Sequence, residues 1–594
     1  MTAQMSKGPI AGASVVVVKD GALFFSKGYG YEDMEKKVPV DPEQTLFRPG
    51  SVSKLFTWTA VMQLVEQGKL DLDADVNTYL RDFKLDATYP QPVTLRNLMT
   101  HTAGFEDGAI GYLIADSEKD LLPLGTWLQS HVPYRARPVT TDFTSGANSS
   151  YSNWGTALAG RIVEIASGLP FDDYIEQHIF TPLGMSRSTF REPLPPELAQ
   201  RMSAGYVFEG GKFERRDFEF IHAAGPAGSM SATAADLAKF MLAYLEGGTV
   251  GGARILAPET VRLMHTRTMS PDPAVNGSGL GFYETWINGR RVIGHGGDTL
   301  YFHSVLALLP ELRLGLFATI NTSGEGAGAS VALERAFVEH YFPAVLPQVR
   351  PRADAAQRNE RYAGSYRALR RSYTKLEKLL AGLSDEKVTA MPDGTLLMTG
   401  LENKPARWVE VGEGVFRDAE HDVFMAFKGD DGGRATQMVG PFAFIASERV
   451  QWYESSALHG FIVVLGIALF VSTLVSAIRQ RRADRDGAAN VRWARPVLAL
   501  AGALLLAFLI ISALALAGGY DDLIHKIPTA LYLALLFPLL AIPLALVSIY
   551  FTVIVWRRGA WRFGARLHYT LATLAAVCFL FILNYWNLLG YKFG

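Results

Sequence analysis

The sequence predicts three parts: an α/β domain with one antiparallel sheet packed on helices, a small all-β domain, and four transmembrane helices. Strand-like stretches lie at both ends of residues 1–342, with amphipathic helices between them. Short β-like runs alternate with Asp-Gly turns over residues 356–452. After Ala457, apolar runs of about 20 residues dominate, and this is the length needed to cross a bilayer.

Size and composition exclude several classes of protein. The chain has 594 residues, of which 49% are hydrophobic and 19% charged, and its net charge is -1. A chain this long holds two or more domains, and a near-neutral charge offers no basic face for nucleic acid. The single cysteine, Cys578, excludes an internal disulfide, and the twelve histidines show no H-E-x-x-H spacing. We therefore expect no cofactor, no metal and no nucleic-acid partner.

Local patterns place elements in the first part. The stretch A13-S-V-V-V-V-K-D-G-A-L-F-F-S-K-G-Y29 predicts a β-hairpin. Residues 51–67 predict a mostly buried helix that Gly68 closes. Further helices are expected at 154–167 and 234–245, and further strands at 279–286, 291–294 and 305–319. Three prolines and the loss of the apolar pattern predict a linker at 343–355.

Four segments are long and apolar enough to span a membrane: 457–478, 496–517, 529–555 and 567–589. The first connection carries Arg479, Arg481, Arg482, Arg485, Arg492 and Arg495, and the third carries Arg557, Arg558, Arg562 and Arg566. The second carries Asp521 and Asp522, with Lys526. Cationic loops stay in the cytoplasm. We therefore expect a multi-pass protein of the bacterial cytoplasmic membrane, anchored in the lipid bilayer, with residues before Ala457 on the periplasmic or extracellular side.

Export of a domain of this size requires a signal sequence. The opening MTAQMSKGPIAGASVVVV lacks a basic n-region followed by a proper apolar h-region. We expect the natural start to lie upstream, or the signal to have been removed.

The stretch R48-P-G-S-V-S-K-L-F-T-W58 places Ser51 and Lys54 where the chain enters an apolar helix. A serine hydroxyl needs a base and an oxyanion site to act as a nucleophile. Residues three apart share a helix face, and a lysine in a dry pocket has a lowered pKa, so Lys54 can accept the serine proton. The same spacing recurs at Ser372–Lys375 and Ser384–Lys387, so spacing alone indicates only a capping serine and a surface lysine. The apolar helix favours Ser51, because a buried lysine without a role is costly.

Two further motifs point to the same chemistry. Y151-S-N153 precedes an apolar helix; a phenol beside a lysine ammonium is expected to have a lowered pKa and to shuttle a proton, and an amide can hold a substrate carbonyl. G294-H-G-G-D298 lies between two β-like runs, where backbone N–H groups can face an oxyanion. In isolation, His295 is more typical of a polar residue at a strand end.

These motifs occur in this order, about 100 and about 140 residues apart, and resemble the serine β-lactamase and penicillin-binding protein superfamily, in particular its class C-like branch. The resemblance covers residues 10–342. It includes A13-S-V-V-V-V-K-D-G21, L98-M-T-H-T-A-G-F105 and G225-P-A-G-S-M-S-A-T-A-A-D236. It implies an α/β (α+β) sandwich of the β-lactamase/DD-peptidase type, with an all-helical lobe and the site between sheet and lobe.

The resemblance also implies a role for each motif residue. Ser51 would be the acylated nucleophile, Lys54 its general base, and Tyr151 the phenol that relays the proton to the leaving group. Asn153 would bind the substrate amide, and His295, Gly296 and Gly297 would replace the Lys-Thr-Gly strand of the family. The backbone N–H groups of Ser51 and Asp298 would form the oxyanion hole.

The function expected is that of a membrane-anchored serine hydrolase that forms an acyl-enzyme on Ser51. Its substrates would be small peptides, amides or esters, as for D-aminopeptidases, D,D-peptidases and esterases. Because His295 and Gly296 replace Lys and Thr, and neutral histidine holds a carboxylate less well, β-lactam hydrolysis is disfavoured. The alternative is a catalytically weak sensor or binding protein for cell-wall peptides. Transport is disfavoured because the spans carry almost no charge. The oligomeric state and the role of the small β domain stay open.

Overall fold

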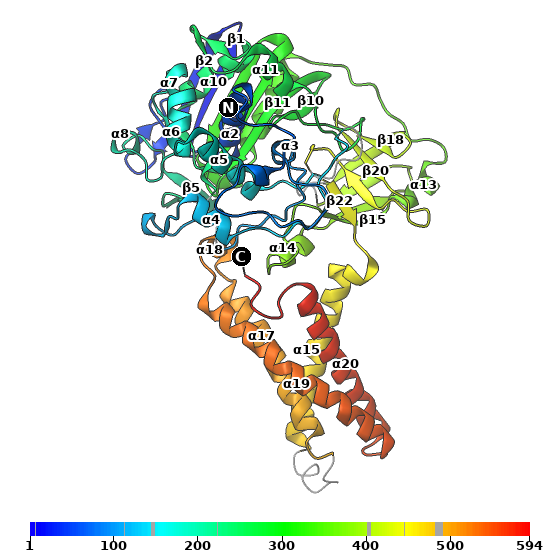
Figure 1. Ribbon diagram of the computed structural model, residues 1–594. Coiled ribbons are helices and arrows are strands. Elements are labelled where there is room, and N and C mark those ends of the chain that lie inside the picture. The colour runs from blue at the N-terminus through cyan, green and yellow to red at the C-terminus, as the bar shows by residue number, and fades with distance from the viewer. Residues whose placement is uncertain are drawn as a thin grey trace. The chain divides into compact units, whose positions relative to one another are not determined.

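The computed structural model describes residues 1–5, 8–111, 113–143, 149–221, 224–400, 405–444, 446–480 and 491–593 (Figure 1). They form two compact units. The globular unit is made of Met1–Asp107, Leu113–Arg370 and Glu386–Arg449. The helical unit is made of Gly108–Tyr112, Arg371–Asp385 and Val450–Gly594.

A seven-stranded sheet with the order β10-β11-β12-β13-β1-β2-β3 forms the centre of the α/β domain. Its strands are β1 (Gly12–Lys19), β2 (Ala22–Asp33), β3 (Val38–Pro39), β10 (Tyr283–Ile287), β11 (Arg290–Asp298), β12 (His303–Leu309) and β13 (Leu314–Ile320). The predicted N-terminal hairpin is confirmed, and β1 also pairs antiparallel with β13. The strand expected at 305–319 is instead two strands, because a turn begins at Pro310 and Arg313 adopts a left-handed φ of 48°.

Helices cover both faces of this sheet, which explains the run of four valines in β1. Val15 and Val17 pack with Val338 of α12 (Ala329–Tyr341) on one face. On the other face, α10 (Ala234–Leu245) contacts β1 and β13. A strand buried on both faces has a continuous apolar sequence rather than an alternating one. The predicted sandwich is confirmed.

The helical lobe of this domain is built around α2 (Lys54–Glu66) and α5 (Asn153–Ser167), which pack against each other. The lobe also holds α3 (Leu95–Met99), α4 (Leu124–Ser130), α6 (Phe171–Ile175) and α9 (Gly225–Gly228), all in contact with α5. The remaining elements of the domain are short: α1 (Thr2–Met5), α7 (Thr181–Leu183), β4 (Ser188–Thr189), α8 (Pro196–Ala199), β5 (Gly205–Glu209), β6 (Lys212–Arg216), β7 (Ser231–Ala232), β8 (Thr249–Val250), β9 (Ala253–Arg254), α11 (Pro258–His265) and β14 (Thr322–Gly324).

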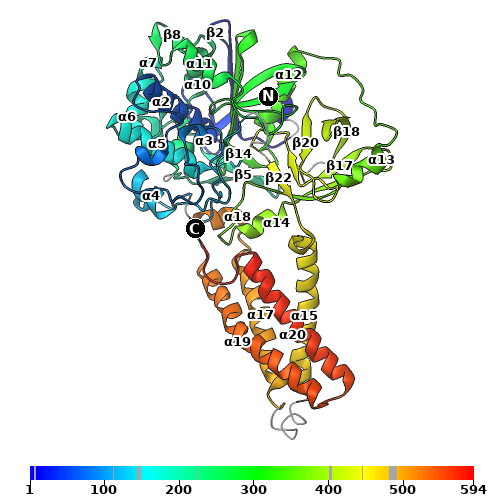
Figure 2. The same ribbon diagram turned by 45° about the vertical axis from the view of Figure 1, so that its right-hand side comes forward.

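The small all-β domain is a closed eight-stranded barrel (Figure 2). Its strands are β15 (Gly364–Ala368), β16 (Glu386–Ala390), β17 (Leu396–Thr399), β18 (Ala406–Gly412), β19 (Val415–Asp418), β20 (Phe424–Lys428), β21 (Gln437–Val439) and β22 (Ala446–Arg449), preceded by α13 (Ala355–Arg358). Aromatic side chains such as Tyr366, Trp408 and Phe416 form its core. Residues Arg371–Asp385, with α14 (Lys378–Leu383), belong to the helical unit. The linker at 343–355 stays a prediction.

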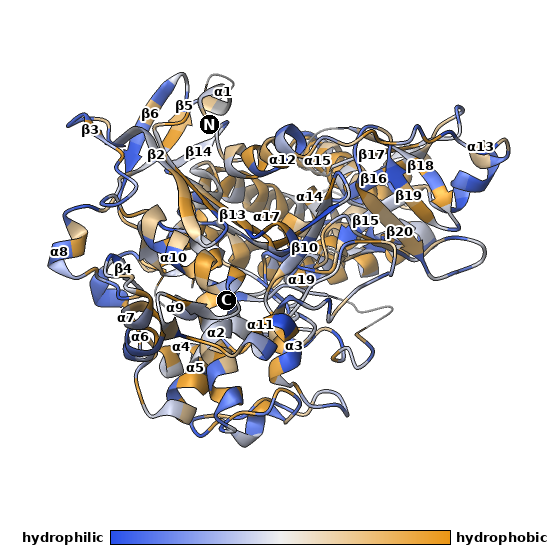
Figure 3. Cartoon of the chain, turned by 90° about the horizontal axis from the view of Figure 1, so that it is seen from above, coloured by the Kyte–Doolittle hydropathy of each residue, from blue (hydrophilic) through white to orange (hydrophobic). Residues whose placement is uncertain are grey.

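Four helices of the helical unit are long and apolar enough to cross a membrane: α15 (Ser456–Arg479), α17 (Ala494–Ala515), α19 (Thr529–Arg557) and α20 (Phe563–Tyr585). Figure 3 shows α15, α17 and α19 mostly in hydrophobic colours. Small residues such as Ala494, Ala541 and Ala576 are buried where the helices pack together, as is usual for helices that associate in lipid. The short α18 (Gly519–His525) lies between α17 and α19 in the chain. The predicted Arg481, Arg482 and Arg485 lie outside the described residues, and the sidedness of the spans stays a prediction.

Candidate active site

Ser51 lies in a 3-10 turn (Gly50–Ser53) that runs directly into α2. Two glycines bring β11 against this turn. Gly50 has a left-handed φ of 54°, and a Cβ on it would lie 2.7 Å from the backbone nitrogen of Asp298. A Cβ on Gly297 would lie 2.9 Å from the backbone nitrogen of Ser51. The structure therefore brings together the backbone nitrogens of Ser51 and Asp298, the two predicted for the oxyanion hole.

The amine of Lys54 is fully buried among three oxygen atoms. Its Nζ lies 2.9 Å from Ser51 Oγ, 2.8 Å from Asn153 Oδ1 and 2.7 Å from the backbone oxygen of Ala227. The last two are carbonyl oxygens, which only accept hydrogen bonds. A neutral amine would donate its two N–H groups to them, and its lone pair would then be left for the hydroxyl proton of Ser51. The geometry suits a base that removes that proton.

Burial lowers the pKa of Lys54 well below its ordinary value, as predicted from the sequence. The positive charge of Arg370 lowers this pKa further, and the negative charge of Asp107 opposes the shift. Both effects that lower the pKa favour the neutral amine, which is the form that can take the Ser51 proton.

Tyr151 is buried beside this amine, with its ring centre 4.9 Å from Lys54 Nζ. The expectation of a lowered phenol pKa is wrong. Burial raises the pKa of Tyr151 to about 12, although the charge of Arg370 and a hydrogen bond with Ser51 oppose the rise. The expectation assumed a charged ammonium, and burial instead disfavours charge on both groups. Tyr151 is therefore a neutral hydroxyl that can give and accept a proton.

Asn153 is the first residue of α5, and the preceding Ser152 caps this helix through the backbone N–H of Gly155. The cap places Asn153 with its Oδ1 on Lys54. The side-chain amide nitrogen is then the group that remains to donate to a substrate carbonyl.

His295 lies on β11, buried between Tyr283 and Tyr151 at ring-centre distances of 4.0 and 6.4 Å. Its Nδ1 contacts the backbone oxygen of Gly296, which can only accept, so Nδ1 carries the hydrogen. Burial lowers the pKa of His295 to about 3, with a further contribution from Lys54. The imidazole is therefore neutral at pH 7.

Four residues at this site have no role in the sequence predictions: His101, Tyr283, Arg370 and Phe444. The ring of His101 lies 4.1 Å from that of Tyr151, and the residue belongs to the segment L98-M-T-H-T-A-G-F105, so a signal for it existed. Arg370 comes just after β15 of the barrel, and Phe444 comes just before β22. The guanidinium carbon of Arg370 lies 4.5 Å from the Tyr151 ring centre. No local pattern marks these two residues, because they reach the site only through the fold.

The other S-x-x-K copies have ordinary structural roles. Ser372 Oγ accepts the backbone N–H of Lys375 at 3.1 Å, which closes a turn. Ser384 Oγ donates to the backbone oxygen of Leu380, one turn earlier, at 3.3 Å. Neither contact resembles that of Ser51.

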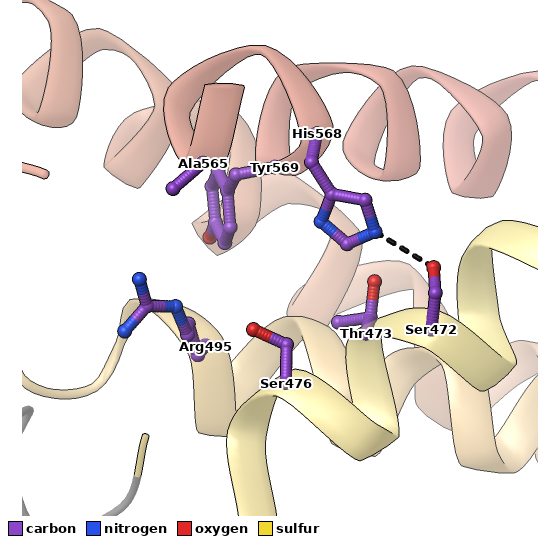
Figure 4. Close-up of a pocket in the computed structure, with 7 residues that line it drawn as sticks. All are labelled: Ser472, Thr473, Ser476, Arg495, Ala565, His568 and Tyr569. Carbon is purple, nitrogen blue, oxygen red and sulfur yellow. Dashed lines mark hydrogen bonds between the residues drawn. The ribbon is translucent and has the colours of Figure 1, made fainter. Parts of the chain in front are cut away.

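A pocket of about 220 Å³ lies between α15, α17 and α20 (Figure 4). It is lined by Ser472, Thr473, Ser476, Arg495, Ala565, His568 and Tyr569. Ser472 Oγ lies 2.7 Å from His568 Nε2 and 2.9 Å from the backbone oxygen of Leu469. Because that carbonyl takes the hydroxyl proton, the imidazole donates to Ser472 and does not activate it. The pair is a hydrogen bond between helices.

Within the part of the chain that the structure describes, no group of three or more His, Cys, Asp or Glu side chains could hold a metal ion.

Comparisons with known proteins match the globular unit. The Beta-lactamase family matches residues 1–339. Protein flp of Staphylococcus aureus (strain MW2) is 25% identical over 324 residues, which are 54% of this chain and 61% of flp. Penicillin-binding protein 4 of Amycolatopsis lactamdurans is 30% identical over 328 residues, which are 53% of this chain and 81% of that protein. The chain thus spans less than two thirds of the length of flp.

Among solved structures, the crystal structure of SurE superimposes with a TM-score of 0.53 at 22% identity, and the match covers 75% of this chain and 97% of SurE. Identity at this level shows a common fold alone. The family match covers more than half of the chain and includes every predicted site residue. The chain belongs to the Beta-lactamase family.

Proposed function

We propose that the protein is a membrane-anchored serine hydrolase that forms an acyl-enzyme on Ser51. The observation that carries the proposal is the position of the buried Lys54 amine, 2.9 Å from Ser51 Oγ and next to two carbonyl oxygens that would take both N–H groups of a neutral amine. Members of this family are usually serine hydrolases, and the lowered pKa of Lys54 supports the same role in this chain.

The proposed reaction begins when Lys54 takes the Ser51 proton while Oγ bonds to the substrate carbonyl carbon. The backbone N–H groups of Ser51 and Asp298 hold the oxyanion, and such donors each contribute about 3 kcal/mol to catalysis. Tyr151 gives its hydroxyl proton to the leaving group and regains a proton from Lys54. Water then attacks the acyl-Ser51 carbonyl while Lys54 takes its proton. The bond between the carbonyl carbon and Oγ breaks, Lys54 returns the proton to Oγ, and the acid product leaves.

The proposed substrates are small peptides, amides or esters. Asn153 would donate its amide hydrogen to a substrate carbonyl, and His295, Gly296 and Gly297 would line the strand along which the substrate lies. One of the relatives, from Amycolatopsis lactamdurans, is named as a penicillin-binding protein, which supports a cell-wall peptide or a mimic of one. The neutral His295 disfavours efficient β-lactam turnover.

We also propose that the catalytic domain lies outside the cytoplasm. The arginine-rich connections around residues 479–495 and 557–566 support this sidedness, since such loops stay in the cytoplasm. A cysteine reporter in the connection at 516–528 should react with an impermeant maleimide in intact cells, and one in the connection at 558–562 should not.

The Ser51→Ala protein tests the catalytic proposal. We expect it to lose labelling by a fluorescent penicillin and by a fluorophosphonate. Ser384→Ala is the matched control, because it removes a serine of the same S-x-x-K spacing, and it should label like the unmodified protein. Undiminished labelling of the Ser51→Ala protein would refute the assignment. Unmodified protein that binds penicillin but never becomes acylated would instead favour the sensor hypothesis.

A further inference from the structure

The barrel domain contributes a cation to the candidate active site. Arg370 follows β15, and its guanidinium carbon lies 4.5 Å from the Tyr151 ring centre. Its Nε lies 2.8 Å from Asp107 Oδ2. Among the described residues, its two terminal nitrogens have no hydrogen-bond partner, and its side chain is 47% exposed. The guanidinium is thus held by Asp107 through Nε, and its terminal nitrogens stay accessible as hydrogen-bond donors beside the Tyr151 phenol.

The charge of Arg370 acts on several ionisable groups of the candidate active site. It lowers the pKa of Lys54, of His101 and of Tyr151, in each case as a contribution smaller than that of burial. An effect on three neighbouring groups requires that the guanidinium lie close to all of them. A substrate that acylates Ser51 would therefore pass within reach of this charge.

The barrel also supplies an aromatic wall beside this cation. The ring of Phe444, just before β22, lies 3.9 Å from that of Tyr283 and 5.8 Å from that of Tyr151. Tyr283 in turn contacts His295. The cation and the aromatic side chains thus adjoin the strand that is proposed to align the substrate.

Polar contacts hold the barrel on the α/β domain at this edge. Asn276 Nδ2 donates to the backbone oxygen of Pro441 at 2.7 Å. Arg137 pairs with Glu448 at 2.7 Å, and Lys428 pairs with Asp272 at 3.4 Å. Because these contacts surround the segment that carries Phe444, the barrel forms part of the wall of the site.

We propose that Arg370 binds a carboxylate of the substrate, so that the barrel domain provides the anion subsite of the active site. The inference rests on the proposed acyl-transfer function. The planar guanidinium matches a carboxylate through two parallel hydrogen bonds. Asp107 would repel a phosphate monoester, with a charge near −2, about twice as strongly as a carboxylate with a charge of −1, so a carboxylate is the better fit beside it. The neutral His295 supplies no competing cation.

The test compares benzylpenicillin with its methyl ester, which differ only in the carboxylate. Each compound competes with a fluorophosphonate for Ser51, and the ratio of the two acylation rates measures the preference for the acid. We expect Arg370→Gln to lower this ratio about 10- to 100-fold, the usual worth of a charged hydrogen bond. Arg370→Lys should lower it less, because the charge remains and the donor fork is lost.

Arg407→Gln is the matched control. Arg407 lies on β18 of the same barrel, pairs with Asp393 at 2.6 Å and is also 47% exposed. The acid-to-ester ratio of this variant should equal that of the unmodified protein. Loss of the Arg370 charge also changes the pKa of Lys54, but this change alters the acylation rates of acid and ester together and cancels in their ratio. An unchanged ratio in Arg370→Gln would therefore overturn the proposal.

A binding measurement separates this proposal from the catalytic one. In the Ser51→Ala background, calorimetric titration should show tighter binding of benzylpenicillin than of its methyl ester, and Arg370→Gln should remove the difference. This result would support the carboxylate subsite even if the unmodified protein reacts with neither compound. Equal binding of acid and ester in the Ser51→Ala protein would overturn it.

Discussion

One serine in each unit lies beside a nitrogen base. In the globular unit, Ser51 Oγ lies 2.9 Å from Lys54 Nζ, and in the helical unit, Ser472 Oγ lies 2.7 Å from His568 Nε2. Their surroundings differ. Ser472 lies inside α15 and donates to the backbone oxygen of Leu469, one turn earlier. Ser51 lies in the turn that opens α2, and the first N–H groups of a helix have no partner within it. A short distance to a base therefore does not make a nucleophile. Whether a serine can act as a nucleophile depends on which group receives its hydroxyl proton and on whether it lies at the start of a helix or inside it.

Among the variants that test this comparison, removal of the Lys54 amine should have the largest effect on the labelling of Ser51. Lys54→Met keeps an unbranched side chain in the buried position and removes the amine. We expect fluorophosphonate labelling of Ser51 to slow by about 1,000-fold or more, because Ser51 then has no proton acceptor. Lys387→Met, from the S-x-x-K copy at Ser384, is the control and should label normally. A loss of less than 10-fold in Lys54→Met would mean that another group is the base.

Disruption of the contact between β11 and the turn that carries Ser51 should have the next largest effect on acylation. In Gly297→Ala the new Cβ would meet the backbone of Pro49 and Ser51, so the turn and the strand must separate. We expect acylation to slow by about 100-fold, since the oxyanion donors would no longer converge. At Gly296, a Cβ would meet only Ser304 O at 4.0 Å, an ordinary contact. Gly296→Ala should therefore slow acylation much less, and equal losses in the two variants would contradict the role of this contact.

The pH dependence of stability isolates the buried amine. An unfolded lysine titrates near 10.4, and the pKa of folded Lys54 lies well below that value. Between the two pKa values the unfolded chain binds one more proton, so stability rises with pH in this window, by at most about 1.4 kcal/mol per pH unit. Lys54→Met lacks this dependence. We expect its Tm advantage over the unmodified protein to grow as the pH falls from about 10. A difference that stays constant with pH would show that Lys54 titrates normally.

The smallest effect should come from Ser472. Ser472→Ala removes the hydrogen bond between α15 and α20, and such bonds in membrane proteins contribute about 0.6 kcal/mol on average. We expect a small decrease in the free energy of unfolding in detergent and no change in labelling of Ser51. Slower labelling in this variant would break the comparison, because it would give the Ser472–His568 pair a part in the reaction.

Several features were predictable because they depend on local pattern. The β1–β2 hairpin follows from the strand-forming runs on either side of Asp20 and Gly21, and the four candidate spans follow from length and hydrophobicity. Ser51 and Lys54 were found together because three residues along a helix place them on one face. The strand at 305–319 was predicted too long, because Pro310 was not read as a turn inside a continuous apolar run.

Other features depended on the environment of each group. The pKa of Tyr151 was expected to fall beside a charged lysine, and it rises because both groups are buried and the lysine favours its neutral form. The tautomer of His295 follows from the backbone oxygen of Gly296, a contact that only the strand geometry creates.

The amino-acid sequence by itself determined the candidate spans, the main helices and the pairing of Ser51 with Lys54, because each arises from neighbours within a few turns of chain. Only the tertiary structure decided what surrounds that pair. The closed barrel returns Arg370 and Phe444 to Tyr151, about 220 and 290 residues earlier in the chain. Charge and burial act through space, so the pKa values and the proposed carboxylate subsite depend on contacts that no local pattern encodes.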